Sequence, residues 1–127
     1  MGKILIVDDS DFDRLMIARA LNKNIEDLVL FEFSNGQDAL DQIIEVLPDL
    51  IVLDVRMPGM DGFEVLLSIR RNPDFKDRSV VMLSGSADAK DMKMAEECGA
   101  NAYYVKPSNI QAYYDIAQEI QSQYLQS

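Results

Sequence analysis

Segments of two kinds alternate along the whole chain: short apolar runs, and longer segments whose apolar residues recur at helical spacing. Residues 4–7, 50–53 and 80–83 are apolar throughout. A short run without polar alternation is typical of a strand that is buried on both faces. Residues 28–33 and 102–105 also resemble strands, but they contain a glutamate and a pair of tyrosines respectively. We therefore expect five strands, with these last two at the edges of a sheet and the other three inside it.

Each apolar run is followed by a segment whose apolar residues return every three or four positions, which predicts a helix. These segments begin near Ser10, residues 34–37, Asp61, Asp88 and Ser108, and they end near Asn22, Pro48, Pro73, Glu97 and Tyr124. Two of the starts have the spacing of a capping box, because Asp61 precedes Glu64 and Ser108 precedes Gln111. Gly99 stands just beyond the fourth segment, where a glycine commonly closes a helix.

Strict alternation of strands and helices predicts a parallel sheet with helices on both of its faces. With the apolar strands inside and the other two outside, the expected strand order is 2-1-3-4-5, as in flavodoxin-like folds. No linker, repeat or low-complexity segment interrupts the alternation. A length of 127 residues, 48% of them hydrophobic, suits one compact domain, so we expect residues 1–127 to form a single α/β domain.

The balance of charge narrows the range of partners. The chain has 22 acidic and 12 basic residues, which gives a formal net charge of −10. Such a chain is expected to avoid nucleic acid and anionic membrane surfaces, and to complement a cation or a basic patch on another protein. The apolar run near the N-terminus is far too short for a signal peptide or a membrane span.

Cysteine and histidine are scarce, and their scarcity excludes several kinds of chemistry. Cys98 is the one cysteine, so no internal disulfide can form and a cytoplasmic location is expected. The chain contains no histidine. This excludes a nucleophile activated by histidine, a histidine metal ligand, and a role as the phosphohistidine donor in phosphoryl transfer.

Polar side chains stand where the expected strands end. Asp8 and Asp9 follow the first strand, Asp54 the third, Ser84 the fourth and Lys106 the fifth. Ligands of such folds bind where the strand order reverses, between the first and third strands, so the three aspartates should meet there. Three carboxylates and one ammonium group carry a net charge of about −2, which favours a hard divalent cation, Mg²⁺ above all, over zinc.

The chemistry that this arrangement favours is attack of a carboxylate on a phosphoryl group. Asp8 and Asp9 are adjacent and suited to hold a metal ion, whereas Asp54 projects alone, so we assign Asp54 as the nucleophile. Lys106 and the hydroxyl group of Ser84 would hold the phosphoryl oxygens. Singly, each residue has an ordinary interpretation, such as a helix cap or a surface lysine. Their joint placement at strand ends favours the functional interpretation.

Four motifs, in this order, resemble the receiver domain of bacterial two-component response regulators, in the single-domain form found in chemotaxis. They are Ile-Leu-Ile-Val-Asp8-Asp9, Asp54-Val-Arg-Met-Pro-Gly-Met-Asp-Gly, Ser84-Gly-Ser and Tyr103-Tyr-Val-Lys106-Pro107. The resemblance covers essentially the whole chain. It implies a protein that accepts a phosphoryl group on Asp54 from a histidine kinase or a histidine phosphotransfer protein. Such a protein is not an enzyme in the usual sense, although it catalyses its own phosphorylation and slow dephosphorylation.

The resemblance also assigns roles at the metal site. Asp9, Asp54 and the backbone carbonyl of Arg56 would bind Mg²⁺ directly, and Asp8 would contribute through water. Arg56 and Ser86 occupy positions that tune the lifetime of the phosphoryl group in this family.

Further roles concern the switch that reports phosphorylation. By resemblance, Ser84 is the switch hydroxyl, Tyr103 is the switch aromatic, and the Lys106–Pro107 peptide is cis, which aims the lysine. Ser84 stands where threonine is commoner, and Gly85 where alanine is usual. Neither departure removes a catalytic group, so we expect a working receiver domain.

The chain ends at Ser127, soon after the last expected helix, so we expect the signal to pass to a separate effector protein. Movement of Ser84 toward the phosphoryl group would let Tyr103 turn inward. This movement couples the site to the surface made by the fourth helix, the fifth strand and the fifth helix. The candidate contact residues on that surface are Lys90, Lys93, Met94 and Tyr113 or Tyr114.

Three alternative functions fit parts of the pattern. A phosphohydrolase of the haloacid-dehalogenase type also uses an aspartyl nucleophile and Mg²⁺, but it needs a second aspartate where this chain has Arg56. A flavodoxin-like cofactor binder needs a phosphate loop after the first strand, where Asp8 and Asp9 would repel anions. An interaction module that works without phosphate stays open, and a phosphorylation assay separates it from a working receiver.

Overall fold

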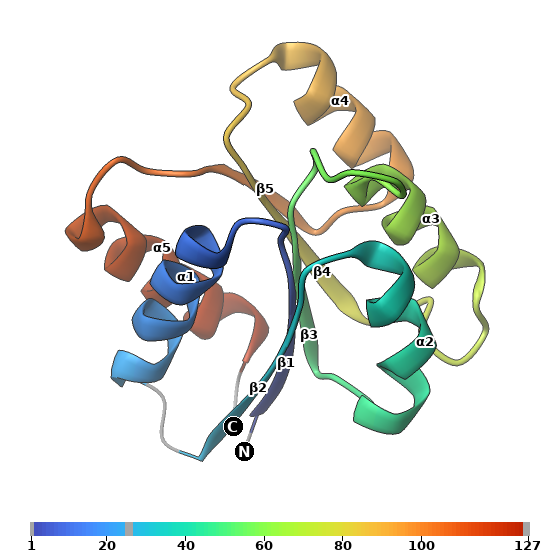
Figure 1. Ribbon diagram of the computed structural model, residues 1–127, viewed down its shortest axis with the longest axis horizontal. Helices are drawn as coiled ribbons and strands as arrows, with labels where there is room; N and C mark the ends of the chain where they lie inside the picture. Colours follow the sequence, from blue (N-terminus) through green and yellow to red (C-terminus); the bar gives the residue numbers. More distant parts are fainter. Residues whose placement is uncertain (1, 25–26, 126–127) are drawn as a thin grey trace.

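The computed structural model describes residues 2–24 and 27–125. In this part of the chain, five strands form one parallel sheet in the order β2-β1-β3-β4-β5, which confirms the predicted fold. The strands are β1 (Gly2–Val7), β2 (Leu28–Phe33), β3 (Leu50–Leu53), β4 (Ser79–Ser84) and β5 (Ala102–Val105). The helices are α1 (Asp11–Asn24), α2 (Gly36–Val46), α3 (Gly62–Arg71), α4 (Ala89–Cys98) and α5 (Ile110–Tyr124). Figure 1 looks along the sheet, which separates two layers of helices.

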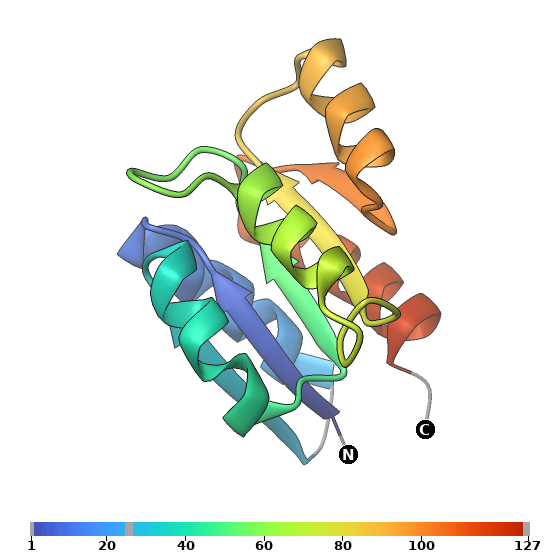
Figure 2. The ribbon, with the colours of Figure 1, turned by 90° about the vertical axis from the view of Figure 1, so that its right-hand side faces the viewer.

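Alternate residues of the interior strands supply two separate hydrophobic cores. Leu5 and Val7 of β1 pack with residues of α2, α3 and α4, whereas Ile4 and Ile6 pack with residues of α1 and α5. Successive side chains of a strand point to opposite faces, so a strand that is covered on both faces must be apolar at every position. Figure 1 shows α1 and α5 on one side of the sheet, and Figure 2 faces the layer of α2, α3 and α4 on the other.

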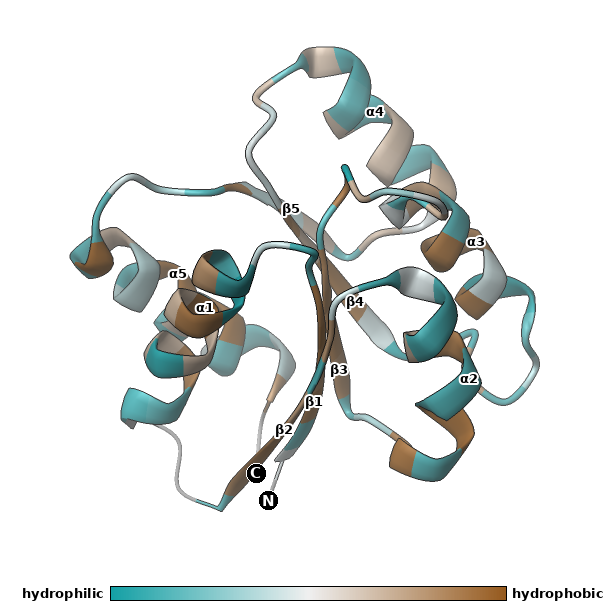
Figure 3. Ribbon diagram, viewed as in Figure 1, coloured by the Kyte–Doolittle hydropathy of each residue, from teal (hydrophilic) through white to brown (hydrophobic). Residues whose placement is uncertain are grey.

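The edge strands differ from the interior ones as their sequences predict. Every residue of β3 is buried, whereas β2 contains only partly buried and exposed residues and its Glu32 is exposed. β5 is nowhere fully buried. In Figure 3 the central strands are mostly hydrophobic, whereas the helices mix hydrophobic and hydrophilic residues.

Two of the expected helix caps are confirmed, and a third lies one residue from its predicted place. Asp61 begins α3 with a complete capping box, and Gly99 closes α4 with a φ of 96°. α5 is capped by Asn109 and not by Ser108, because the Asn109 side chain accepts a hydrogen bond from the amide of Ala112 at 2.8 Å. Asparagine is among the strongest capping residues, so it takes the position beside an equally plausible serine.

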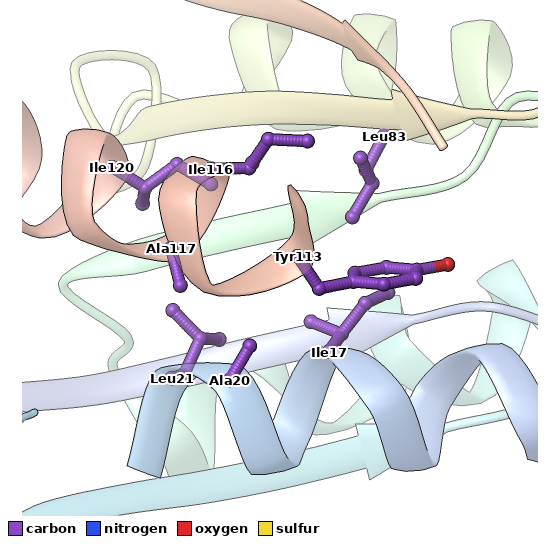
Figure 4. A pocket seen from close by; sticks show the side chains of 8 residues that line it. All are labelled: Ile17, Ala20, Leu21, Leu83, Tyr113, Ile116, Ala117 and Ile120. Carbon is purple, nitrogen blue, oxygen red and sulfur yellow. The ribbon is translucent and has the colours of Figure 1, made fainter. Parts of the chain in front are cut away.

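α1 and α5 lie side by side over a seam of apolar side chains. Figure 4 shows the residues that line it, which are Ile17, Ala20, Leu21, Leu83, Tyr113, Ile116, Ala117 and Ile120. They leave a cavity of only about 10 Å³, which is about the volume that one water molecule needs. This seam is therefore packed core. Among the described residues, no helix is both long enough and apolar enough to cross a membrane.

Candidate functional site

Three aspartates from two neighbouring strands meet at the carboxyl end of the sheet. β1 and β3 pair with Val7 opposite Leu53, so Asp8 and Asp54, which follow these residues, lie side by side. The amide of Asp54 donates to the carbonyl oxygen of Val7 at 2.9 Å. Carboxylate oxygens of Asp8, Asp9 and Asp54 lie within 4.8 Å of one another. The structure thus brings together the carboxylates that stand at these strand ends in the sequence.

Asp54 is nearly buried, with 6% of its surface exposed. Its Oδ1 accepts a hydrogen bond from the amide of Val55 at 2.8 Å, and its Oδ2 accepts one from Nζ of Lys106 at 3.3 Å. Burial and the neighbouring charge of Asp8 raise the pKa of Asp54 to about 6, although the charge of Lys106 opposes this shift. An acid that titrates so close to neutral pH is typical of functional sites.

The ammonium group of Lys106 lies among three carboxylates. Its Nζ is 2.8 Å from Oδ2 of Asp8, 2.8 Å from Oδ2 of Asp13 and 3.3 Å from Oδ2 of Asp54. Burial alone would lower the pKa of Lys106, but hydrogen bonds with Asp13 and Asp8 and the charge of Asp54 outweigh burial and raise it. Lys106 therefore remains a fixed cation at the centre of the site.

The carboxylate of Asp8 fits a cation site. Its Oδ1 accepts from the amide of Ser10 at 2.9 Å. Its Oδ2 is buried and, within the described part of the chain, is paired with Nζ of Lys106 at 2.8 Å. The three carboxylates of Asp8, Asp9 and Asp54 still outnumber the single ammonium group of Lys106, and a divalent cation would compensate the remaining negative charge. Asp9 is exposed and adds a ligand from the solvent side. The donors that these three aspartates offer are carboxylate oxygens, which suit Mg²⁺ or Mn²⁺.

Ser84 ends β4 beside Lys106. Only 1% of its surface is exposed, and its Oγ accepts a hydrogen bond from the amide of Ser86 at 3.2 Å. The amide of Lys106 donates to the carbonyl oxygen of Ser84 at 2.7 Å, which holds the ends of β4 and β5 together. The hydroxyl of Tyr103 donates to the carbonyl oxygen of Ser86 at 2.8 Å. The ring of Tyr103 is therefore tied to the loop that follows Ser84.

The Lys106–Pro107 peptide bond is trans, so the cis bond expected from the family resemblance is wrong. Trans is the isomer that X–Pro bonds favour, by about 0.5–1 kcal/mol. From this arrangement Nζ of Lys106 already reaches Asp8, Asp13 and Asp54. No cis bond is required to aim the lysine into the site.

The loop after Asp54 folds back onto the site because Gly62 has no side chain. A Cβ atom at Gly62 would lie 2.1 Å from the carbonyl oxygen of Asp54. The amide of Gly62 also donates to the carbonyl oxygen of Val55 at 2.8 Å. Gly59, at the tip of the loop, has a φ of 76°, which favours glycine. The glycines of the Met-Pro-Gly-Met-Asp-Gly segment therefore set the path of this loop.

Two acidic residues of the site region escaped the sequence reasoning. Asp13 contacts Lys106, as described above, and Asp91 of α4 forms an ion pair with Arg56, whose Nη2 lies 2.8 Å from Oδ1 of Asp91. Both acids belong to the first turn of a helix, where the helix dipole favours negative charge. Because acidic residues are common in the first turn of a helix, their presence did not indicate these specific contacts, and no other sequence signal would have found them.

Comparison with known proteins identifies the family. The model of the response regulator receiver domain matches residues 4–118. The chain belongs to this family. The receiver domain is 33% identical over 108 residues to the sporulation initiation phosphotransferase F of Bacillus subtilis, a match that covers 85% of this chain and 84% of that protein. It is also 36% identical to the transcriptional regulatory protein AfsQ1 of Streptomyces coelicolor, covering 84% of this chain but 45% of that protein.

Solved receiver structures have the same fold. The Mn²⁺-bound form of the response regulator Rcp1 matches with a TM-score of 0.87 and 31% identity, over 100% of this chain and 96% of that chain. The phosphorylated cyanobacterial phytochrome response regulator RcpA matches with a TM-score of 0.89 and 30% identity, over 98% of this chain and 94% of that chain. One of these relatives thus holds a divalent metal ion and the other is phosphorylated.

Proposed function

We propose that this receiver domain accepts a phosphoryl group on Asp54 from a phosphohistidine of a histidine kinase or a histidine phosphotransfer protein. The observation that carries the proposal is the setting of Asp54, which is nearly buried, 3.3 Å from Nζ of Lys106 and beside Asp8 and Asp9. Membership of the family supports the general phosphoacceptor role. We also propose that residues 1–127 act as one domain and work in the cytoplasm, which the single cysteine favours.

In the transfer, a carboxylate oxygen of Asp54 forms a bond to phosphorus while the bond from phosphorus to the imidazole nitrogen of the donor breaks. The electron pair of the broken bond stays on that nitrogen, and because the other ring nitrogen of the donor carries a proton, the imidazole leaves as a neutral ring. The attacking carboxylate must be ionised. With a pKa of about 6, Asp54 is largely ionised at neutral pH, and the cation of Lys106 favours that form.

The groups that would hold Mg²⁺ are the carboxylates of Asp8, Asp9 and Asp54 and the backbone carbonyl of Arg56. When bound, the ion would neutralise charge on the oxygens of the transferring phosphoryl group. The amide of Ser10 orients the carboxylate of Asp8 in advance, because it donates to Oδ1 at 2.9 Å while Oδ2 pairs with Nζ of Lys106 at 2.8 Å.

Lys106 and Ser84 would bind the phosphoryl oxygens once they arrive. The contact of Lys106 with Asp54, at 3.3 Å, is the longest of its three ion pairs, so a phosphoryl oxygen would replace this contact most readily. Oγ of Ser84 accepts from a backbone amide, which leaves its hydrogen able to turn toward a phosphoryl oxygen. Both groups would therefore sense the modification of Asp54.

We propose that the signal leaves through the surface of α4, β5 and α5 to a separate effector protein. Its exposed side chains include Lys90, Lys93, Met94 and Val105. Tyr113 does not belong to this set, because it is 5% exposed and packs in the seam between α1 and α5. Amide exchange with and without beryllofluoride and Mg²⁺ tests this route. Changes confined to the loops around Asp54, without any at Tyr103 or α4, would contradict it.

Phosphorylation of the purified protein with acetyl phosphate, followed by intact mass spectrometry, tests the phosphoacceptor role. We expect one phosphoryl adduct that requires a divalent cation, survives acid and is removed by hydroxylamine. Asp54→Asn should abolish the adduct. Asp115→Asn, which changes an exposed aspartate on α5, should leave the adduct unchanged. An adduct that persists in Asp54→Asn would contradict the assignment.

A further inference from the structure

Arg56 and Asp91 join the loop after β3 to the first turn of α4. Nη2 of Arg56 lies 2.8 Å from both carboxylate oxygens of Asp91, across 35 positions of sequence. The Asp91 side chain is 9% exposed, whereas the Arg56 side chain is 66% exposed. The carboxylate is therefore the enclosed half of the pair, and the arginine covers it from the solvent side.

The charge of the Asp91 carboxylate is compensated by Arg56. Within residues 2–24 and 27–125, no other ion pair or side-chain hydrogen bond reaches the Asp91 carboxylate. Its position in the first turn of α4 favours negative charge, but a nearly buried carboxylate without a partner is strongly disfavoured. As long as α4 is docked as observed, Asp91 holds the Arg56 side chain in one place.

The backbone of Arg56 is also held on either side. Val55 is 0% exposed and Met57 is 7% exposed, so both neighbours of Arg56 are anchored in the core. The carbonyl oxygen of Val55 accepts a hydrogen bond from the amide of Gly62 at 2.8 Å. With its neighbours buried and its side chain bound to Asp91, the peptide unit of Arg56 has little freedom to rotate.

We infer that Asp91 is a positioning residue for the divalent cation site and acts through Arg56. The ion pair fixes the orientation of Arg56, and thereby of the backbone carbonyl oxygen that the proposed function assigns to the ligand set with Asp8, Asp9 and Asp54. The inference rests on the proposed function, because it requires a cation at these carboxylates. If docking of the first turn of α4 favours binding of the cation, binding of the cation must favour that docking by the same free energy.

The affinity of the folded full-length protein for Mg²⁺, measured by isothermal titration calorimetry, tests this role. Asp91→Ala should weaken binding about tenfold, the low end of the loss seen when an outer-shell partner is removed. Arg56→Met separates positioning from charge. Removal of a positive charge should by electrostatics alone tighten the binding of a cation, whereas loss of positioning should weaken it. The double variant should bind no more weakly than Arg56→Met, because both changes remove one contact.

Two variants serve as controls. Arg56→Lys should restore tight binding, because one nitrogen makes both contacts with Asp91 and an ammonium nitrogen can replace it. Glu96→Gln removes a negative charge from an exposed position on the same helix and should leave the affinity unchanged. Circular dichroism verifies that each variant is folded.

Amide exchange provides a second measurement that needs no phosphoryl transfer. Mg²⁺ should slow exchange in residues 89–93 of the wild-type protein and should have no such effect in Asp91→Ala. If wild type binds Mg²⁺ while Arg56→Met binds it equally or more tightly, the positioning role is wrong and the proposed function stands. If wild type binds no Mg²⁺, both are wrong.

Discussion

Replacement of Asp54 by asparagine should stabilise the metal-free protein at neutral pH. Burial and the charge of Asp8 raise the pKa of this carboxyl group from its ordinary value of 3.8 to about 6. At about 1.4 kcal/mol for each pKa unit, the ionised carboxylate disfavours the folded state by about 3 kcal/mol at pH 7. Asparagine carries no charge and therefore avoids this cost in folding free energy.

The lost contact with Lys106 is already contained in this figure. An asparagine oxygen can still accept from the amide of Val55, as Oδ1 of Asp54 does at 2.8 Å. The contact with Nζ of Lys106 at 3.3 Å is lost, because an amide nitrogen would face an ammonium group. The charge and the hydrogen bond of Lys106 lower the pKa of Asp54, so the value of about 6 already includes their contribution. The net increase in the free energy of unfolding should therefore be about 3 kcal/mol, which raises the Tm by roughly 10 °C.

The effect has a characteristic pH dependence. Because the folded-state pKa of Asp54 is raised, its penalty is absent where the carboxyl is protonated in both states, grows as the pH rises from 3.8 to about 6, and is complete above that. Urea unfolding in the presence of a chelator, followed by circular dichroism, should therefore show the full difference near pH 7 and almost none near about pH 3. Asp115→Asn is the control and should show no such difference. Equal stability of Asp54→Asn and wild type near pH 7 would refute this reasoning.

Gly62→Ala should destabilise the fold by about 3 kcal/mol or more, because the new Cβ would lie 2.1 Å from a backbone carbonyl oxygen. Gly85→Ala meets nothing within 4 Å, so urea unfolding should place it within about 0.5 kcal/mol of wild type; similar losses at both glycines would contradict the packing described. Asn109→Ala should lower the free energy of unfolding by about 1 kcal/mol and Ser108→Ala by almost nothing. A larger loss for Ser108→Ala would show that Ser108, and not Asn109, caps α5. Lys106→Ala should fold and bind Mg²⁺ in calorimetry, yet lose phosphorylation-dependent binding of the effector; unchanged dependence would count against its role.

The runs of consecutive apolar residues carry most of the information about this fold. A strand such as Ile4 to Val7 must be apolar at every position because its alternate side chains enter two different cores, and that requirement is visible in the sequence. The strand order followed from which runs contain polar or aromatic residues. The start of α5 was misplaced by one residue because Ser108 and Asn109 are both good caps, and local sequence does not decide between them.

The residues of the candidate site that directly follow strands were predictable from the sequence. Asp8, Asp54 and Lys106 follow parallel strands directly, so their side chains must gather at one edge of the sheet. Asp13 and Asp91 were not predictable, since their contacts depend on how α1 and α4 dock against the sheet. The trans peptide after Lys106 was missed because the expectation came from the family resemblance and not from the residues.

The central claim is that Asp54, and no neighbouring carboxylate, carries the phosphoryl group. Reduction of the phosphorylated protein with borohydride converts an aspartyl phosphate to homoserine, which tandem mass spectrometry then locates in the sequence. The account predicts homoserine at position 54, formed only when a divalent cation is present during phosphorylation. Homoserine at position 8, 9 or 13, or labelling that does not depend on the cation, would contradict it.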